Sequence, residues 1–228
     1  MALYFAGSNG NYAEITNAYN LFSNLQSTIS FWVKPLYDYS IIMATQTASL
    51  GALFVEANNV AGSMYIGVNG TYPLVSNAAF VSNSWVHVAI TGGGSSSGIN
   101  NALIYVNGVV YHVHLVTAKW STLTNKSIYV GRFDSGTFPM TGHLQDIRVW
   151  NRTLTSFEVY QAYCNQDVTS GLTERWKLDE TSGSTFAGSI GGYTGTITGT
   201  PSWSTVSLPY GSLGGGFGFG TGMTGGME

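Results

Sequence analysis

Charged side chains are scarce in this chain of 228 residues. Only 8% of the residues are Asp, Glu, Lys or Arg, whereas an ordinary globular protein carries about 25%. The surface must therefore be built from Ser, Thr, Asn, Gln and Gly, as it often is in secreted and virion β-proteins. The net charge of −3 and the lack of any Lys/Arg run predict that the chain binds neither nucleic acid nor a membrane surface.

Cysteine is almost missing as well. Cys164 is the only one, which excludes an internal disulfide and a cysteine-based metal site, and we predict it to be a small buried residue on a helix. The N-terminal run MALYFAGSNGNYAEI lacks the basic and long apolar regions of a signal peptide, and no segment is long enough to span a bilayer. We therefore expect the chain to fold in a cytoplasm.

What the sequence does contain is period-2 alternation of apolar residues, broken by Gly, Asn and Ser, with almost no helical periodicity. This pattern predicts an all-β sandwich forming one domain over residues 1–206. Asn107-Gly108 supplies the two positive-φ residues of a type I′ hairpin turn. The predicted strands are residues 3–7, 12–15, 28–35, 39–45, 51–57, 62–70, 84–92, 101–108, 109–116, 126–132, 142–151, 173–179 and 192–198.

The run GHLQDIRVWNRTLTSFEVYQAY, residues 142–163, is the densest in charged and aromatic residues. It raises the question of a catalytic carboxylate pair formed by Asp146 and Glu158. Alternation over its first half predicts a strand with one core face, which carries Ile147 and Val149. The other face then carries Asp146, Arg148 and Trp150.

The second half of this run predicts the one short helix of the chain. Thr155-Ser156-Phe157-Glu158 matches a capping box, in which the Thr155 hydroxyl accepts from the Glu158 N–H and the Glu158 carboxylate accepts from the Thr155 N–H. Phe157, Tyr160 and Cys164 follow at helical spacing on one face. Because Glu158 has a structural role in the cap, the run is predicted to be scaffold rather than an active site.

Several runs, taken in order, resemble those of laminin-G-like domains with the concanavalin A-like lectin/glucanase fold. They are ALYFAGSNGNYAEI, ISFWVKP, WVHVAIT, LIYVNGVV, SIYVGR and GHLQDIRVWNRTLTSFEVYQAY, and then GLTERWKLDETSGST. The resemblance extends from residue 2 to about residue 203 and implies a two-sheet antiparallel jelly-roll sandwich with one concave sheet. Domains of this kind bind glycans or proteins, some hydrolyse polysaccharides and many carry a structural Ca²⁺, so the fold alone does not choose a function.

The resemblance also shows which acidic residues of similar domains are absent from this chain. Hydrolases of this fold resemble one another in a strand carrying Glu-x-Asp-x-x-Glu, and no such run occurs here, so we predict no catalytic residues and no enzyme activity. At positions where similar domains carry acids that bind a cation, this chain has Ala6, Asn11 and Gln145, and only Asp146 remains. Since Ca²⁺ needs several carboxylate oxygens, we predict no metal and no cofactor.

The histidines give little further indication of a metal site. His112 and His114 share one face of a predicted strand and are expected to be polar residues on the solvent side of a hairpin rather than a metal-binding pair. His87 is expected to pack in the fold, and His143 is expected to lie on the rim.

Glycan binding is the remaining candidate function. It needs aromatic faces that stack on sugars and amide or carboxylate groups that bond hydroxyls. Trp32, Trp85 and Trp176 lie in strong strand patterns and are predicted to be core. The candidates in expected loops are Tyr37, Tyr39, Tyr72, Trp120, Asp134 and Phe138, with Asn77 and Asn100 as further polar partners.

The C-terminal stretch GSLGGGFGFGTGMTGGME is rich in glycine and has almost nothing with which to fold alone. We expect the tail at residues 207–228 to dock on a neighbouring chain, because glycine lets one backbone approach another closely. Phe217, Phe219 and Met223 are the candidate anchors. An equally simple alternative is a tail that packs on its own domain.

The favoured hypothesis is a non-enzymatic virion structural protein, a bacteriophage capsid decoration or fibre subunit made in the host cytoplasm. Its partners would be other virion chains, and its sandwich loops would contact host glycans. The alternative is a carbohydrate-binding module of a bacterial protein, and a glycoside hydrolase is the third hypothesis.

Overall fold

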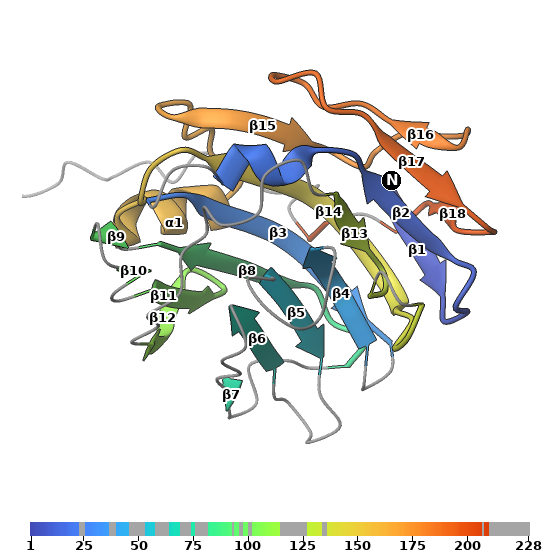
Figure 1. Ribbon diagram of the computed structural model, residues 1–228, viewed down its shortest axis with the longest axis horizontal. Coiled ribbons are helices and arrows are strands. Elements are labelled where there is room, and N and C mark those ends of the chain that lie inside the picture. Colours follow the sequence, from blue (N-terminus) through green and yellow to red (C-terminus); the bar gives the residue numbers. More distant parts are fainter. Residues whose placement is uncertain are drawn as a thin grey trace, which may run out of the picture.

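A computed structural model describes residues 1–22, 26–36, 40–45, 53–57, 64–68, 74–75, 82–92, 94–95, 98–99, 102–114, 127–133, 136–206 and 208–209. Two antiparallel sheets lie face to face and enclose the main apolar core (Figure 1). The predicted all-β sandwich with one short helix is confirmed. None of the described helices is long and apolar enough to cross a membrane.

Each sheet contains eight strands. Sheet A runs in the order β12 (Val109–His114), β11 (Ala102–Val106), β8 (Val86–Thr91), β3 (Thr28–Pro35), β14 (Thr141–Trp150), β1 (Ala2–Ala6) and β18 (Ser202–Ser204), with β15 (Leu172–Trp176) paired to β14. Sheet B runs in the order β16 (Thr185–Phe186), β17 (Gly195–Thr198), β2 (Tyr12–Ile15), β13 (Ile128–Val130), β4 (Ser40–Thr45), β5 (Leu53–Ala57), β6 (Met64–Val68) and β7 (Leu74–Val75).

Every strand predicted from alternation is present, with ends that differ by a few residues. The sequence did not predict the shorter elements, which have too few residues to show a period: β7, β16, β18, the small pair β9 (Gly94–Ser95) and β10 (Gly98–Ile99), and the 3₁₀ helix η1 (Ala18–Phe22).

Alternate residues of the two sheets build the core between them. Phe31 and Val33 point inward from β3, and Ile15 and Val130 point inward from β2 and β13 on the opposite sheet. The period of two therefore sends the intervening residues of β2 and β13 to the outer face of sheet B. This places the residues from which a surface site can be built.

The hairpin between β11 and β12 has the predicted turn. Asn107 and Gly108 adopt φ values of 49° and 78°, as the two central residues of a type I′ turn require. The Asn107 side chain also accepts a hydrogen bond from the His87 N–H at 2.9 Å. The turn is thereby joined to the neighbouring strand β8.

The helix α1 (Ser156–Tyr163) begins with the predicted capping box, which is confirmed in both directions. The Thr155 N–H donates to the Glu158 carboxylate at 2.9 Å, and the Glu158 N–H donates to the Thr155 hydroxyl at 3.3 Å. The helix buries Val159 and Ala162 against sheet A.

The face of α1 that carries Phe157 and Tyr160 points outward, and these two side chains are 68% and 51% exposed. Cys164 is only half-buried, so the prediction that it is a buried residue is wrong. It lies at the C-terminal cap of α1, where the helix ends and leaves it uncovered on one side.

Strand β14 differs from its prediction, because both of its faces are buried. Ile147 and Val149 enter the main core as expected, but Asp146, Arg148 and Trp150 are buried as well. They are covered on the outer face by residues that follow the strand: α1, Leu154 and Val168 pack with Trp150 in a second apolar cluster. A single core face was therefore the wrong prediction.

A β-bulge in β14 sets these directions. Between the pairs Gln145–Trp32 and Arg148–Ser30 the strand holds one residue more than β3 does. Asp146 adopts φ of 54° there, the left-handed conformation that opens a G1 bulge and that Asp tolerates better than most residues. The extra residue lets Leu144 and Ile147 both enter the core while Asp146 stays with Arg148 on the outer face.

Candidate functional site

Most of the predicted glycan-binding residues lie outside the described part of the chain. This holds for Tyr37, Tyr39, Tyr72, Trp120 and Asp134, for Asn77 and Asn100, and for the tail residues Phe217, Phe219 and Met223. Phe138 is described: it is 43% exposed, has φ of 54°, and packs edge to face on Phe133 with 6.2 Å between ring centroids. An exposed aromatic ring therefore lies where a loop residue was predicted.

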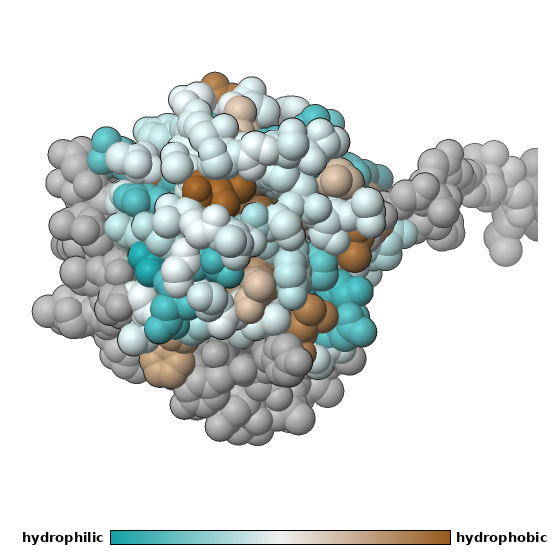
Figure 2. Space-filling view, turned by 90° about the vertical axis from the view of Figure 1, so that its right-hand side faces the viewer, coloured by the Kyte–Doolittle hydropathy of each residue, from teal (hydrophilic) through white to brown (hydrophobic). Residues whose placement is uncertain are grey.

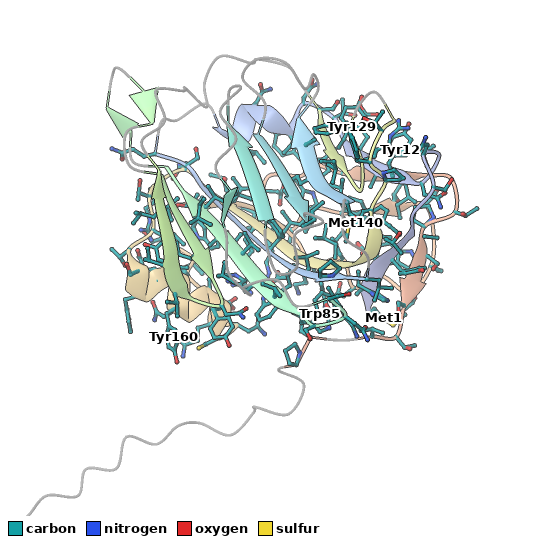
Figure 3. All side chains as sticks on the ribbon, turned by 90° about the horizontal axis from the view of Figure 1, so that it is seen from below. Met1, Tyr12, Trp85, Tyr129, Met140 and Tyr160 are labelled. Carbon is teal, nitrogen blue, oxygen red and sulfur yellow. The ribbon has the colours of Figure 1, made fainter. Side chains whose placement is uncertain are left out.

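Two tyrosines lie together on the outer face of sheet B. Tyr12 and Glu14 point outward from β2 because Ala13 and Ile15 fill the core. Tyr129 points outward from the adjacent β13, directly opposite Glu14 in the register. The ring centroids of Tyr12 and Tyr129 are 6.0 Å apart, and Figure 3 shows the two side chains next to each other at one end of the sandwich.

Arg132 fixes the first of these rings. Its guanidinium carbon lies 3.5 Å from the centroid of the Tyr12 ring, and its Nη1 donates to the backbone oxygen of Asn9 at 2.7 Å. Gly131 lets the chain turn after β13, because its φ is 89° and a Cβ there would lie 2.7 Å from the ring of Phe5. The cation over the ring and the bond to the backbone hold Tyr12 in one orientation.

The remaining groups around the tyrosines are polar. The Tyr129 hydroxyl donates to the Glu14 carboxylate at 3.4 Å. On the next strand, β17, Thr198 pairs with Tyr12 and Thr196 with Glu14, and both threonines are exposed. We refer to Tyr12, Glu14, Tyr129 and Arg132 as the β2–β13 surface. It combines two aromatic faces with a carboxylate, a guanidinium and neighbouring hydroxyls, the groups that bind sugars.

The carboxylates of the 142–163 run are held in ion pairs. Asp146 accepts from Arg148 Nη2 at 2.6 Å and from Arg175 Nε at 2.7 Å. Burial alone would raise the pKa of Asp146, but the two arginines outweigh it and lower the pKa below its ordinary value. A carboxyl group held ionised in this way is a poor proton donor.

Glu158 is held just as firmly at the start of α1. It accepts from Arg152 Nη2 at 2.6 Å, and the hydrogen bonds from Arg152 and Thr155 lower the pKa of Glu158 to about 2. Both candidate catalytic acids therefore stabilise the fold, as the scaffold hypothesis predicted for Glu158.

Two of the positions where a cation-binding acid would be expected, Asn11 and Gln145, lie in different parts of the fold, and Asn11 is held in a hydrogen bond. The Asn11 side-chain oxygen accepts from the N–H of Thr200 at 2.8 Å and so holds the turn before β18. Gln145 lies in sheet A opposite Trp32, whereas Asn11 precedes β2 in sheet B. Among the described residues, no three His, Cys, Asp or Glu side chains form a group that could hold a metal ion.

His87, His143 and Trp32 of sheet A lie on its outer face, where they pack with other aromatic rings. His87 is buried next to Trp32, with ring centroids 5.1 Å apart, so its predicted packing role is confirmed. Desolvation and then the charge of Arg148 lower the pKa of His87 to about 3, so the ring is neutral. The side chains of His112 and His114 lie outside the described part of the chain.

Three predictions about histidine and tryptophan residues need correction. His143 is not a rim residue, because it is 7% exposed and packs against Tyr4 with 4.9 Å between ring centroids. Trp32 is buried as predicted but on the outer face of sheet A, under Tyr163 of α1, rather than in the sandwich core. Trp85 is only half-buried, whereas Trp176 lies in the main core as predicted.

Tyr12, Tyr129 and Arg132 were not among the residues predicted to bind a ligand, which were sought in loops. In YAEI and SIYVGR the outward direction of the tyrosines could be read from the small or branched apolar residues that alternate with them. The side of the molecule that carries β2, β17 and β18 is pale over most of its area, with small separate apolar patches (Figure 2). It is thus the weakly polar surface that the composition predicts.

The family model for the concanavalin A-like lectin/glucanases superfamily matches residues 7–160, which is more than half of the chain. No curated protein matches.

Solved structures show the same fold at low sequence identity. A candidate carbohydrate-binding protein from Bacteroides ovatus has a TM-score of 0.62 and 20% identity, over 89% of this chain and 62% of that one. A heptameric SAP-like pentraxin from Limulus polyphemus has a TM-score of 0.59 and 19% identity, over 86% and 94%. The CBM40 module of the Ruminococcus gnavus IT-sialidase, bound to α2,3-sialyllactose, has a TM-score of 0.56 and 14% identity, over 71% and 95%.

These likenesses establish the fold but not the ligand. Moreover, this chain spans less than two thirds of the Bacteroides protein.

Proposed function

The chain belongs to the concanavalin A-like lectin/glucanases superfamily, and from this membership we propose that it is a non-enzymatic carbohydrate-binding domain. The β2–β13 surface carries the proposal. Its two tyrosine rings are half-buried, lie 6.0 Å apart and are oriented by Arg132 and Glu14. Aromatic side chains that are already fixed lose little conformational entropy when a sugar stacks on them. The structural neighbours described as carbohydrate-binding support the same proposal.

Replacing Tyr129 or Tyr12 by Ala is expected to weaken glycan binding about tenfold or more, because each change removes one stacking face from a small surface. Ligands are first identified for the wild-type chain on a glycan array, and affinities are then measured by calorimetry. Thermal unfolding checks that each variant is folded.

Tyr160→Ala is the matched control for these two variants, since Tyr160 is an exposed tyrosine on α1. It should bind like the wild type. Unchanged affinity in both the Tyr12 and the Tyr129 variants would place the glycan site elsewhere on the domain.

The proposal treats the domain as a binder rather than a hydrolase. Support comes from the ion pairs of Asp146 and Glu158 and from the lack of a Glu-x-Asp-x-x-Glu run in the sequence. If incubation with a bound polysaccharide releases new reducing ends, and if an acid-to-amide variant abolishes that release, then the chain is a glycosidase.

We also infer that the domain serves as a structural subunit of a virion, as a bacteriophage capsid decoration or fibre component that meets host glycans. Its sparse charge, 8% of residues, and its glycine-rich tail favour this context over a free enzyme. The tail at residues 207–228 would join neighbouring chains, and the sandwich would face outward. A module of a bacterial polysaccharide-binding protein is the competing context, and it predicts a monomer.

Deleting residues 207–228 is expected to abolish self-association or incorporation into the particle, because Phe217, Phe219 and Met223 are removed together with the glycines that let backbones approach. Light scattering of the full and truncated chains measures the assembled mass, and glycan binding by the truncated chain shows that it is folded. If the truncated chain assembles as fully as the complete one, the docking role of the tail is wrong.

A further inference from the structure

Arg132 differs from the other arginines in how its charge is used. The chain contains four arginines. Arg148 and Arg175 pair with Asp146, and Arg152 pairs with Glu158. Arg132 has no carboxylate partner among the described residues.

The side chain of Arg132 is nevertheless fixed in place. It lies over the Tyr12 ring at 3.5 Å, and its one hydrogen bond to a described residue goes from Nη1 to the Asn9 backbone oxygen. Its Nε–H is buried and has no hydrogen-bond partner in the part of the chain that the structure describes. A guanidinium offers five donors in a planar fork, so most of this fork is left unused by the described part of the protein.

An oriented guanidinium with unused donors is suited to a planar oxyanion. A carboxylate can accept two parallel hydrogen bonds from the fork, and such charge-assisted pairs are stronger than bonds between neutral groups. The tyrosine rings beside it would contact the sugar ring that carries the carboxylate. Because the fork is already held by Tyr12 and Asn9, little rotamer entropy is lost on binding.

We propose that the β2–β13 surface selects acidic carbohydrates, and that Arg132 binds the carboxylate of a uronic-acid-type sugar. The proposal rests on the carbohydrate-binding function proposed above and adds the class of sugar. Glu14 is the opposing charge on the same surface. Its carboxylate accepts from the Tyr129 hydroxyl, which orients Tyr129, and its negative charge limits the affinity for an anion.

The test compares polygalacturonate with its methyl-esterified form, which has the same sugar backbone without the charge. The wild-type chain should bind the acid form about tenfold more tightly than the ester, since a charge-assisted pair of this kind is worth about that factor. Raising the salt concentration should reduce the difference, because the surface is partly exposed.

Four variants locate the effect. Arg132→Gln should make the acid and ester forms bind equally, and Arg132→Lys should restore only part of the preference, because an ammonium lacks the fork. Glu14→Gln should tighten binding of the acid form. Lys34→Gln removes one positive charge from sheet A instead and should leave the preference unchanged, which separates a local contact from net charge.

The outcomes separate this inference from the function on which it rests. If the two polymers bind equally, the assignment to acidic sugars is overturned while carbohydrate binding stands. If the acid preference survives in Arg132→Gln, Arg132 is not the group that binds the carboxylate and its assignment is overturned. Array hits confined to neutral glycans have the same meaning. If no glycan binds at all, the proposed function fails and this inference fails with it.

Discussion

Replacing Asp146 by Asn is expected to lower the free energy of unfolding by about 3–5 kcal/mol, because the change leaves a buried arginine without its counter-ion. Asp146 bonds to Arg148 at 2.6 Å and to Arg175 at 2.7 Å, and the Arg148 side chain is only 2% exposed. Asn is the informative substitution, since it tolerates the positive φ of 54° at this position as Asp does. The variant therefore removes the charge without straining the bulge.

Thermal unfolding at neutral pH measures the effect of this substitution. A loss of this size in a chain of this length corresponds to a Tm lower by on the order of 10 °C. Asp167→Asn is the matched control, because Asp167 also pairs with Arg175 but is 70% exposed, and such pairs contribute about 0–1 kcal/mol. Equal losses in the two variants would show that burial of the Asp146 network does not matter.

Acid titration provides a second measurement on the same variant. The arginines lower the pKa of Asp146 below its ordinary value of 3.8, although burial alone would raise it. The contribution of Asp146 to stability is therefore complete above that value and is lost as the pH falls below it. Asp146→Asn should flatten this part of the stability profile, whereas the Asp167 variant should keep it.

Replacing Glu174 by Ala is expected to destabilise the fold by on the order of 4 kcal/mol, because three backbone N–H groups lose a charged acceptor worth about 1.5–3 kcal/mol each, while some of them regain water. The Glu174 carboxylate is fully buried and accepts from the N–H groups of Arg175, Ile190 and Tyr193 at 2.9–3.0 Å. It thereby holds the loop between β16 and β17 against β15.

The Glu174→Ala change should loosen the loop between β16 and β17 locally, in addition to lowering the stability of the whole fold. Limited proteolysis is expected to cut the Glu174→Ala variant between residues 187 and 194 at a temperature where the wild type resists cleavage. Glu180→Gln serves as the control, because Glu180 accepts one backbone bond, from Ala187 at 3.2 Å, and is not fully buried. If the Glu174→Gln variant proves as stable as the wild type, the buried charge is not what holds the loop.

Local patterns were sufficient to predict the strands, the type I′ turn and the capping box, because each depends on residues that are close in the sequence. They also contained a signal that was missed in β14. Leu144 and Ile147 are three residues apart although both enter the core, and an interval of three in a period of two indicates a bulge. With that interval taken into account, the shared face of Asp146 and Arg148 could have been predicted.

The β2–β13 surface could be predicted only in part. Alternation could show that Tyr12 and Tyr129 point away from the core, but not that their strands are neighbours, since Glu14 and Tyr129 are 115 residues apart in sequence. The position of Arg132 over Tyr12 depends on that pairing and on the turn at Gly131. His143 was assigned to the rim for a related reason, because the Tyr4 ring that packs on it belongs to β1, far away in the sequence.

The bulge in β14 also determines where this strand can change length during evolution. Loss of Asp146 would leave Gln145 and Ile147 adjacent and in regular alternation, so the same apolar side chains would still enter the core. Loss of a residue from the regular part of β14, away from the bulge, would instead invert every side chain beyond it. A residue can thus be lost at the bulge without reversing the two faces of the strand, although the bulge holds the carboxylate on which two arginines depend.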